Sequence, residues 1–294
     1  MTTSPLANPS ATRALLETYG LATKHRLGQN FLIDNHVIER ICALADLRTE
    51  QRVLEVGPGI GTLTLALVQD AGRVVSIEMD SELEPVLRAH QISHEGFDFI
   101  MGDALKVETV DVAKKLGGEP TALVANLPYN VAATIILDFF ERYPSIERAV
   151  VMVQKEVADR IAAVPGTRAY GAYTAKLALF GQVTGRFEVL PRCFMPAPHV
   201  DSAVVRIDRR PAEGEGALEL PCGLARADVA AVIDAAFAQR RKTIRNSMGA
   251  SGFDKAALDA AFSACGIVPT TRGESLSAED YIRLAAALLE TKQG

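Results

Sequence analysis

The stretch from Arg52 to Gln69, RVLEVGPGIGTLTLALVQ, decides the fold that we expect for this chain. Its first five residues favour a buried strand, its three glycines mark a tight turn, and its last nine residues favour a helix. Glycines at such a turn allow positive φ angles and let the backbone approach a bound group closely, while the start of the helix offers free N–H donors. A strand, a glycine loop and a helix in this order predict a ligand site at the edge of an open α/β sheet.

The chain on the carboxyl side of this stretch repeats the alternation. We expect further strands at residues 73–78, 97–102, 121–126 and 148–153, and helices at residues 81–90, 131–142 and 155–163. Strands separated by helices form βαβ units, whose right-handed crossovers give a parallel sheet with helices on both faces. Two later strand-like runs, at residues 182–190 and 202–209, are joined by a proline-rich loop and predict an antiparallel pair that closes one edge of the sheet.

Changes in composition divide the chain into three predicted parts. Residues 1–22 form a polar N-terminal extension with a short helix at Thr12–Tyr19, and residues 23–210 form the α/β domain. In that domain Asp34 is expected to cap a helix. A polar linker containing Gly and Pro begins at Arg209, and the segments after it, residues 218–294, all favour helices. We therefore expect an α/β domain followed by a small all-α domain.

The overall composition narrows the class of protein. The chain has 294 residues, of which 48% are apolar and 23% are charged, as expected for a globular protein with a full core. No apolar run is long enough to span a membrane and the start lacks the pattern of a signal peptide, so we expect a cytoplasmic protein. The four cysteines are far apart and form no CxxC pair, which favours free thiols over metal ligands. We accordingly predict no membrane association and no metal.

The formal net charge of −5 argues against indiscriminate binding to nucleic acid, because the mean field of the protein repels a polyanion. A nucleic-acid site must therefore be a local basic patch. Two such patches occur: KHR contains Lys24 and Arg26, and QRRKTIR contains Arg240, Arg241, Lys242 and Arg245 within two predicted helical turns. The second patch also fits the solvated face of a helix.

Acidic residues follow the glycine loop at a spacing typical of nucleotide sites. Glu78 ends the strand after Gly57 and Gly59, where a carboxylate can accept hydrogen bonds from both hydroxyls of a ribose. Asp103, at the end of the next strand, either accepts from the amine of an adenine or caps a helix. These features fit NAD, FAD and S-adenosylmethionine alike, although the GxGxG spacing argues against a pyrophosphate over the helix start. A plain strand-to-helix turn also explains the glycines.

The stretch VANLPYN, Val124–Asn130, places a polar cluster at the carboxyl end of a predicted strand. The exocyclic nitrogen of adenine or cytosine is a poor nucleophile, because its lone pair is delocalised into the ring. The Asn126 side-chain oxygen and the Leu127 carbonyl would draw its hydrogens out of the ring plane and stabilise the charge that develops as a methyl group transfers. Pro128 would hold this backbone, and Tyr129 would stack on an extruded base. A simple strand-end turn is the alternative.

Together these segments resemble, in order, the small-subunit ribosomal RNA adenine dimethyltransferases. The matching segments are LGQNFLID, VLEVGPGIGTLT, SIEMD, GDAL, NLPYN, FMPAPHVDSAVVRI, FAQRRKTIRNSM and RGESLSAEDYIRLA. The family puts two methyl groups on N6 of each of two adjacent adenosines near the 3′ end of 16S rRNA. The resemblance implies a Rossmann-like, class I S-adenosylmethionine-dependent methyltransferase sheet and a C-terminal RNA-binding domain. It also implies a monomer that makes N6,N6-dimethyladenosine in the immature 30S subunit, late in ribosome biogenesis.

The resemblance also implies a role for individual residues. The cofactor-binding residues would be Asn30, Leu32, Gly57, Gly59, Glu78, Met79, Asp103, Ala104 and Asn126. The catalytic residues would be Asn126, Leu127, Pro128 and Tyr129, with Phe194 as the second aromatic ring around the flipped adenine. The RNA-binding residues would be Lys24, Arg26, Arg240, Arg241, Lys242 and Arg245. From the sequence alone, Phe194 fits a core position equally well.

One residue departs from the family pattern, and three other functions need to be separated from this one. His199 stands where the family usually has Lys, so a phosphate contact there loses its fixed charge.

A DNA adenine methyltransferase would usually carry a larger target-recognition domain, and a 23S rRNA methyltransferase of the macrolide-resistance type would lack the RRKTIRNSM and RGESLS segments. A non-catalytic assembly factor would not need an intact set of cofactor residues.

Overall fold

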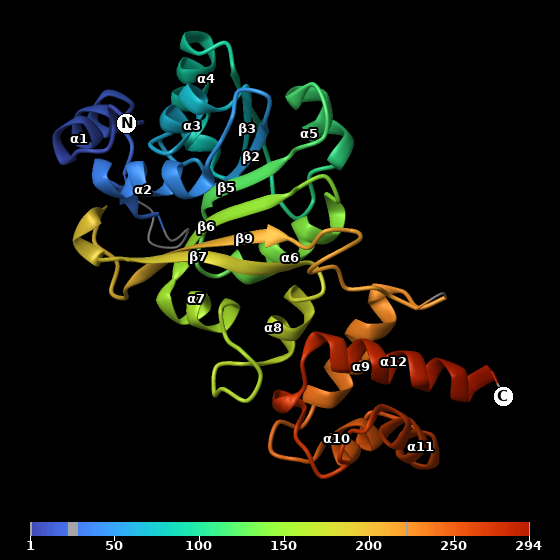
Figure 1. The fold of residues 1–294 in the computed structure, drawn as a ribbon. Coiled ribbons are helices and arrows are strands. Elements are labelled where there is room, and N and C mark those ends of the chain that lie inside the picture. Colours follow the sequence, from blue (N-terminus) through green and yellow to red (C-terminus); the bar gives the residue numbers. More distant parts are fainter. Residues whose placement is uncertain (1, 23–28, 222, 294) are drawn as a thin grey trace. The chain divides into compact units, whose positions relative to one another are not determined.

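The structure is a computed structural model that describes residues 2–22, 29–221 and 223–293 (Figure 1). The chain forms two compact units. The first contains residues 1–158 and 183–209, and the second contains residues 159–182 and 210–294. The second unit therefore takes a segment from the middle of the chain as well as its end, which the predicted boundaries at residues 210 and 218 did not anticipate.

The first unit is built on a seven-stranded sheet. Its strands lie in the order β4 (Phe97–Met101), β3 (Arg73–Glu78), β2 (Arg52–Val56), β5 (Ala122–Asn126), β6 (Arg148–Gln154), β9 (Ser202–Arg209) and β7 (Gly181–Val189). The first five run parallel, and β9 pairs antiparallel with β6 from Arg148↔Asp208 to Gln154↔Ser202. The predicted parallel sheet with an antiparallel edge is confirmed. From β2 the strands are added first toward one edge of the sheet, as β3 and β4, and then toward the other edge, beginning with β5. Open α/β sheets bind ligands at the point between β2 and β5 where this order switches.

The helices of the first unit follow the strands as predicted, with one addition. They are α1 (Pro9–Thr18), α2 (Asn35–Ala45), α3 (Thr64–Asp70), α4 (Glu84–Ser93), α5 (Thr109–Leu116), α6 (Ala132–Arg142) and α7 (Lys155–Ile161), the last of which continues into the second unit. The sequence patterns did not predict α5. They also missed a two-residue ladder between β1 (Phe31–Leu32) and β8 (Phe194–Met195), because nothing local marks a pairing of segments so far apart in the chain.

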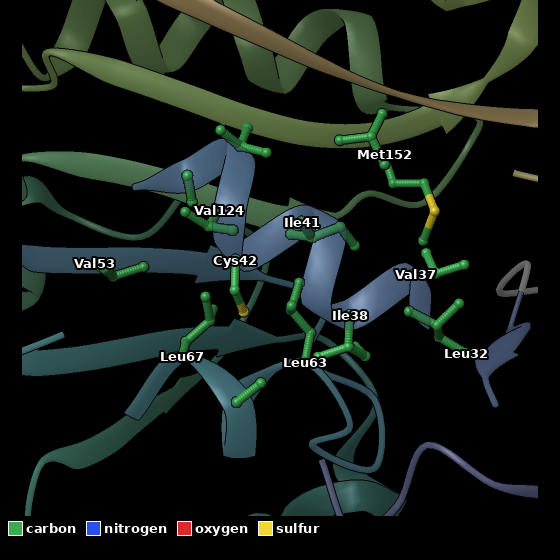
Figure 2. Close-up of a cluster of buried hydrophobic side chains, with 14 of the residues drawn as sticks. Leu32, Val37, Ile38, Ile41, Cys42, Val53, Leu63, Leu67, Val124 and Met152 are labelled. Atoms are coloured by element: carbon green, nitrogen blue, oxygen red, sulfur yellow. The ribbon is translucent and has the colours of Figure 1, made fainter. Parts of the chain in front are cut away.

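The core of the first unit forms because α2 is apolar along one face. The side chains of Val37, Ile38, Ile41 and Cys42 are at most 6% exposed and pack against side chains of the sheet and of α3. Figure 2 shows Ile38 and Cys42 pointing toward Leu63 and Leu67. As predicted, the Asp34 side chain caps this helix by accepting a hydrogen bond from the His36 N–H at 2.9 Å.

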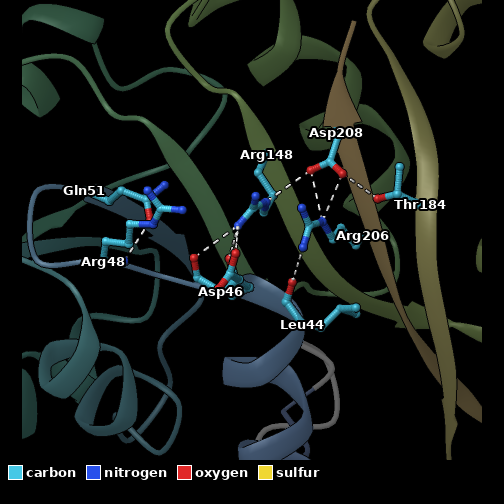
Figure 3. Close-up of polar contacts among 9 residues, drawn as sticks. Leu44, Asp46, Arg48, Gln51, Arg148, Thr184, Arg206 and Asp208 are labelled. Atoms are coloured by element: carbon cyan, nitrogen blue, oxygen red, sulfur yellow. Dashed lines mark hydrogen bonds and ion pairs between the residues drawn. The ribbon is translucent and has the colours of Figure 1, made fainter.

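The carboxyl end of α2 is held by a network of charged side chains (Figure 3). Arg148 of β6 donates to the Ala45 carbonyl, and Arg206 of β9 donates to the Leu44 carbonyl at 3.0 Å. Both arginines bind the Asp208 carboxylate, at 3.1 Å and 3.0 Å. Cationic side chains satisfy the free carbonyls at a helix end, so β6 and β9 fix the position of α2.

The N-terminal extension folds onto the first unit. The Thr2 hydroxyl donates to the Asp70 carboxylate at 2.8 Å, and the Ser4 N–H donates to the Asn35 side chain at 2.8 Å. The helix predicted at residues 12–19 begins earlier, at Pro9, because the Asn8 side chain accepts from the Ala11 N–H and Pro at the first helical position needs no donor.

The second unit is helical and has its own core. It contains α8 (Ala172–Leu177), α9 (Arg226–Phe237), α10 (Ile244–Ala250), α11 (Lys255–Cys265) and α12 (Ala278–Gln293). Two buried tyrosines join its segments: the Tyr170 hydroxyl donates to the Leu276 carbonyl at 2.9 Å, and the Tyr281 hydroxyl donates to the Gly273 carbonyl at 2.8 Å. Tyr170 and α8 also explain why residues 159–182 belong here, since several of their apolar side chains share a core cluster with the C-terminal helices.

Within the described ranges, no helix has the length and apolar character required to cross a membrane.

Candidate functional site

A cavity of about 260 Å³ opens at the carboxyl ends of the parallel strands of the first unit. It lies where β2 is flanked by β3 and β5. The structure brings together at this cavity all the predicted cofactor residues and four of the predicted catalytic residues. These lining residues are Asn30, Leu32, Gly57, Gly59, Glu78, Met79, Asp103, Ala104, Asn126, Leu127, Pro128 and Tyr129.

The glycine loop has the backbone conformation that its sequence predicts. The φ angles of Gly57, Gly59 and Gly61 are 69°, 60° and 87°, a region that other residues rarely adopt. At Gly61 a Cβ atom would lie 2.7 Å from the His90 ring, so a side chain does not fit there. The same ring donates a hydrogen bond to the Ile60 carbonyl at 2.9 Å, which ties the loop to α4.

The Glu78 carboxylate is the best-anchored acid of the cavity. One oxygen accepts from the Met79 and Asp80 N–H groups, both at 2.8 Å, and the other accepts from the Gly59 N–H at 3.2 Å. Burial raises the pKa of Glu78 above its usual value, and these backbone donors oppose the rise. Because the three donors fix its orientation, the carboxylate presents its remaining lone pairs to the cavity, as the recognition of a diol requires.

The next part of the cavity wall combines one acid with apolar side chains. One Asp103 oxygen accepts from the Leu105 N–H at 3.1 Å and the other lies 3.5 Å from the Lys106 ammonium. Asp103 therefore caps a turn and lines the cavity at the same time, so the two predicted roles do not exclude each other. Met79 is 62% exposed although it is apolar, and it lines the cavity together with Ala104. An exposed apolar side chain at a cavity offers a surface for a flat ring.

The segment Asn126–Tyr129 connects β5 to α6. The Leu127 N–H donates to the Met152 carbonyl at 3.0 Å, and the Pro128 carbonyl accepts from the Ala132 N–H at 3.1 Å. Within the part of the chain that the structure describes, no hydrogen bond engages the Asn126 side chain. The Tyr129 hydroxyl lies 2.7 Å from the Ser202 hydroxyl, and burial raises its pKa. The backbone of the segment is thus fixed from both sides, while the Asn126 amide stays available to a ligand.

Phe194 lies apart from this group. Its ring is 3% exposed, belongs to the hydrophobic core, and sits in β8 opposite Leu32 of β1. Of the described residues that line the cavity, none is Phe194. The core position that the sequence equally allowed is therefore the one observed here, and the stacking role stays a prediction that requires this ring to become uncovered when a base enters.

The predicted basic patches have different outcomes. Lys24 and Arg26 lie outside the described residues. Residues 240–242 form a turn between α9 and α10, so the prediction that the second patch lies on a helix is wrong except for Arg245. The helix ends early because the Ile244 N–H donates to the Thr271 carbonyl and Thr243 caps the next helix, which redirects the chain.

The charges of the second patch are partly neutralised inside the second unit. Arg245 binds both oxygens of Asp259 at 2.6 Å and 2.7 Å, which lowers the pKa of that carboxyl. Arg240 lies 3.7 Å from the Glu274 carboxylate. Arg241 and Lys242 are exposed and have no ion pair among the described residues. Among the four cations of this patch, these two side chains are consequently the most available to a phosphate.

The acidic residue Glu55 is among the cavity residues that the sequence analysis missed. Glu55 lies within β2, is 1% exposed and lines the cavity. A single acid within the otherwise apolar run VLEV was the signal that could have identified it, because buried strands rarely carry an unpaired charge. Elsewhere, His199 is exposed, and the described ranges contain no group of three or more His, Cys, Asp or Glu residues arranged to hold a metal ion.

Comparison with known protein families identifies one match over most of the chain. A family model described as ribosomal RNA adenine dimethylase matches residues 20–290. A protein of Kineococcus radiotolerans named ribosomal RNA small subunit methyltransferase A is 42% identical over 287 residues, which cover 96% of this chain and 92% of that protein. A protein of Rhodococcus opacus with the same name is 42% identical over 292 residues, with coverages of 96% and 94%.

Two solved structures have similar folds over nearly their full length. A dimethyladenosine transferase from Plasmodium falciparum is 23% identical with a TM-score of 0.74, covering 90% of this chain and 98% of that one. The 23S rRNA methyltransferase ErmE is 29% identical with a TM-score of 0.67, covering 88% of this chain and 99% of that one. At 23% identity, the likeness to the Plasmodium falciparum structure concerns the fold alone.

Proposed function

The chain belongs to the ribosomal RNA adenine dimethylase family and is an rRNA adenine dimethyltransferase, and we propose that its substrate is the 16S rRNA of the assembling 30S subunit. Four methyl groups would pass to the N6 amines of two adjacent adenosines near the 3′ end, giving N6,N6-dimethyladenosines. The observation that carries this proposal is the 42% identity, over 96% of the chain, to relatives named ribosomal RNA small subunit methyltransferase A.

The cavity fits S-adenosylmethionine by the chemistry of its donors and acceptors. The anchored Glu78 carboxylate would bind the ribose hydroxyls, Asp103 would accept from the adenine amine, and Met79 would cover the adenine ring. The backbone of Gly57 allows close approach because glycine has no side chain, which also permits its φ angle of 69°. When bound, this cofactor supplies a methyl group activated by its sulfonium, so the protein needs no metal for the transfer.

The Asn126–Tyr129 segment would hold the target amine. The Asn126 side-chain oxygen and the Leu127 carbonyl accept the two hydrogens of N6, which localises the nitrogen lone pair toward the methyl group. The same acceptors stabilise the positive charge that develops on the nitrogen, so they favour the transition state over the ground state. Tyr129 would stack on the extruded adenine, held in place by its contact with Ser202.

The remaining parts of the proposal concern the setting of the reaction. We propose that the protein acts as a monomer in the cytoplasm, where its RNA substrate is assembled into subunits. The exposed Arg241 and Lys242 would contact RNA phosphates from the second unit.

The test is a comparison of substrates with a labelled methyl donor. The protein is incubated with undermethylated 30S subunits, naked 16S rRNA, 23S rRNA and DNA, and the products are separated by nucleoside analysis. We expect label in the 30S sample alone, recovered as N6,N6-dimethyladenosine. Label in 23S rRNA or DNA, or label recovered only as another nucleoside, would contradict the proposal.

A further inference from the structure

A tight turn after β4, from Asp103 to Val107, carries the acid that would bind the adenine of the cofactor. The Asp103 carbonyl accepts from the Lys106 N–H at 2.8 Å and from the Val107 N–H at 3.0 Å. Asp103 and Ala104 line the cavity. The direction in which the Asp103 carboxylate points therefore depends on how this turn is held.

One peptide group of the turn orients the Asp103 carboxylate. The Leu105 N–H donates to Asp103 Oδ1 at 3.1 Å. The other carboxylate oxygen lies 3.5 Å from the ammonium of Lys106, whose side chain is 82% exposed, so this ion pair constrains Asp103 little. The Leu105 N–H shares its peptide group with the Ala104 carbonyl. Because a peptide group is planar, whatever fixes the direction of that carbonyl also fixes the direction of the N–H.

The Arg142 side chain, from the last residue of α6, holds that carbonyl. Its Nη2 donates to the Ala104 carbonyl at 3.1 Å, and its Nη1 donates to the Val107 carbonyl at 3.2 Å. The planar guanidinium thus bridges two carbonyls of the turn, which the single ammonium of a lysine cannot do in the same way. The turn is consequently fixed by a side chain from another element.

Arg142 is itself held in place by its surroundings. The Asp138 carboxylate, one helical turn earlier, lies 2.8 Å from Nε of Arg142, and both side chains are half-buried. The guanidinium carbon also lies 5.4 Å from the centre of the Phe139 ring and 5.5 Å from the centre of the Tyr143 ring. A long side chain that is restrained in this way loses little further freedom when a ligand binds, so the bridge is preorganised.

We propose that Arg142 is a positioning residue for the cofactor: by fixing the peptide group between Ala104 and Leu105, it directs the Asp103 carboxylate toward the exocyclic amine of the adenine. Arg142 is not among the described residues that line the cavity, so it acts through the turn and not by contact with the cofactor. This inference rests on the proposed function, since it requires that the cavity bind S-adenosylmethionine with its adenine at Asp103.

The proposal concerns recognition of the amine and not the affinity as a whole. The Glu78 carboxylate, which would bind the ribose, is oriented by the N–H groups of Gly59, Met79 and Asp80, and none of these belongs to the turn. Loss of Arg142 should therefore reduce the preference for a ligand that carries the amine and leave the binding of a ligand without it nearly unchanged. A general loss of stability would instead lower both affinities alike.

Titration calorimetry of the full chain with two ligands measures this preference. The ligands are S-adenosylhomocysteine and its analogue in which purine replaces adenine, so that they differ only in the exocyclic amine. The wild type should bind S-adenosylhomocysteine about 10- to 100-fold more tightly, the range expected for a hydrogen bond to a charged group. Equal binding of the two ligands by the wild type would remove the amine contact of Asp103 and overturn the inference with it.

Arg142→Met is the central variant, because Met keeps much of the apolar part of the side chain and removes both donors. The preference should fall below about threefold, while the affinity for the purine analogue should change by less than about threefold. Arg142→Lys keeps the charge beside Asp138 but cannot bridge both carbonyls, so its preference should lie between those of the wild type and the Met variant. The wild-type preference in either variant would overturn the proposal.

A double variant keeps the outcome decisive if the replacement of Arg142 lowers the stability. Asp103→Ala should abolish the preference by itself. Arg142→Met added to it should change the ratio of the two affinities no further, because both replacements act on one contact. A further change of that ratio in the double variant would show that Arg142 acts on the amine by another route and would overturn the proposal.

The matched control is Arg52→Met, at the start of β2 and so at the opposite end of the strand from the cavity. Arg52 Nε donates to the Glu119 carbonyl at 2.6 Å, so this variant also loses a contact between an arginine and a backbone carbonyl. It should keep the wild-type preference, and a loss equal to that of Arg142→Met would overturn the proposal. A preference that survives in Arg142→Met sinks the inference and leaves the proposed function standing, whereas a wild type that binds neither S-adenosylmethionine nor S-adenosylhomocysteine removes both.

Discussion

At the scale of single residues, the function depends on side chains that the fold leaves without internal partners. The Asn126 amide is one of them: it stands at the end of β5 and lines the cavity, and no hydrogen bond engages it within the described part of the chain. A polar group that the protein does not use for its own stability is a good candidate for contact with a ligand.

Replacing Asn126 by Ala should therefore separate binding from chemistry. The affinity for S-adenosylmethionine, measured by calorimetry, should stay within about tenfold, because Glu78 and Asp103 still hold the adenosine. The rate of methyl transfer in a single turnover should fall about 100- to 1,000-fold, because one acceptor for the developing charge is lost. Asn126→Asp keeps an acceptor oxygen, so its rate of methyl transfer should fall less. Full activity in the Ala variant would exclude Asn126 from the mechanism.

At the scale of elements, the site depends on the position of α2. This helix begins directly after the cavity-lining residues Asn30 and Leu32, and its other end is held by Arg148 and Arg206. Asp208 joins the two arginines and also accepts from the Thr184 hydroxyl at 2.6 Å. Burial raises the pKa of Asp208, but the hydrogen bonds from Thr184, Arg206 and Arg148 outweigh it, so the pKa lies below its usual value.

Asp208→Asn should destabilise the first unit by about 1–3 kcal/mol at neutral pH, measured by urea unfolding, because both arginines lose their charged partner. A carboxyl group with a lowered pKa in the folded state contributes stability above its unfolded pKa, about 3.9, and loses that contribution as the pH falls through the folded pKa. The difference in the free energy of unfolding between variant and wild type should hence be constant from pH 5 to 8 and shrink below about pH 4.

The matched control for this prediction is Glu84→Ala, which removes an exposed ion pair with Arg88 on α4. It should cost less than about 1 kcal/mol, since exposed pairs contribute little. If both variants lose the same free energy of unfolding, or if Asp208→Asn loses none, the network does not hold α2.

At the scale of the whole molecule, an acidic chain must bind a polyanion through local charge. The formal net charge is −5, and several cations of the second unit are already paired with acids, as Arg245 is with Asp259. The turn at Arg241 and Lys242 is exposed and retains its charge. Binding of RNA should therefore depend on this turn more than on the total number of basic residues.

Replacing Arg241 and Lys242 together by Ala should weaken binding to undermethylated 30S particles, and the slope of log K against log salt should fall by about 1 for each cation removed. Filter binding across a range of salt concentrations measures both quantities. Arg245→Ala is the control, because its charge already binds Asp259, and its effect should be smaller. A double variant with the affinity and slope of the wild type would refute the role of this turn.

The local patterns of the sequence predicted most of the first unit. The strand at residues 73–78 and the strand at residues 202–209 have the predicted bounds, because short apolar runs between turn residues leave little choice of register. The predicted site residues from Gly57 to Tyr129 all line the cavity, since they lie at or just after the ends of parallel strands, which meet at one edge of the sheet.

Other features needed contacts between distant parts of the chain. The β1–β8 ladder pairs Leu32 with Phe194, and that ring is buried in a core cluster that includes residues far from it in sequence. Residues 159–182 join the second unit because their apolar side chains share its core cluster, and the Tyr170 hydroxyl donates to the distant Leu276 carbonyl. The turn at residues 240–242 likewise follows from a hydrogen bond to Thr271.

The sequence by itself determined the order of strands and helices, the glycine loop, and the chemistry available at the strand ends, because these follow from local conformational preference and from the spacing of residue types. Only the tertiary structure decided which charges are available. It paired Arg245 with Asp259, left Arg241 and Lys242 exposed, and buried the Glu55 carboxyl group beside the Thr64 and Ser76 hydroxyls. The physical reason is that hydrogen bonding and ionisation depend on neighbours in space, and for these residues the neighbours come from distant parts of the chain.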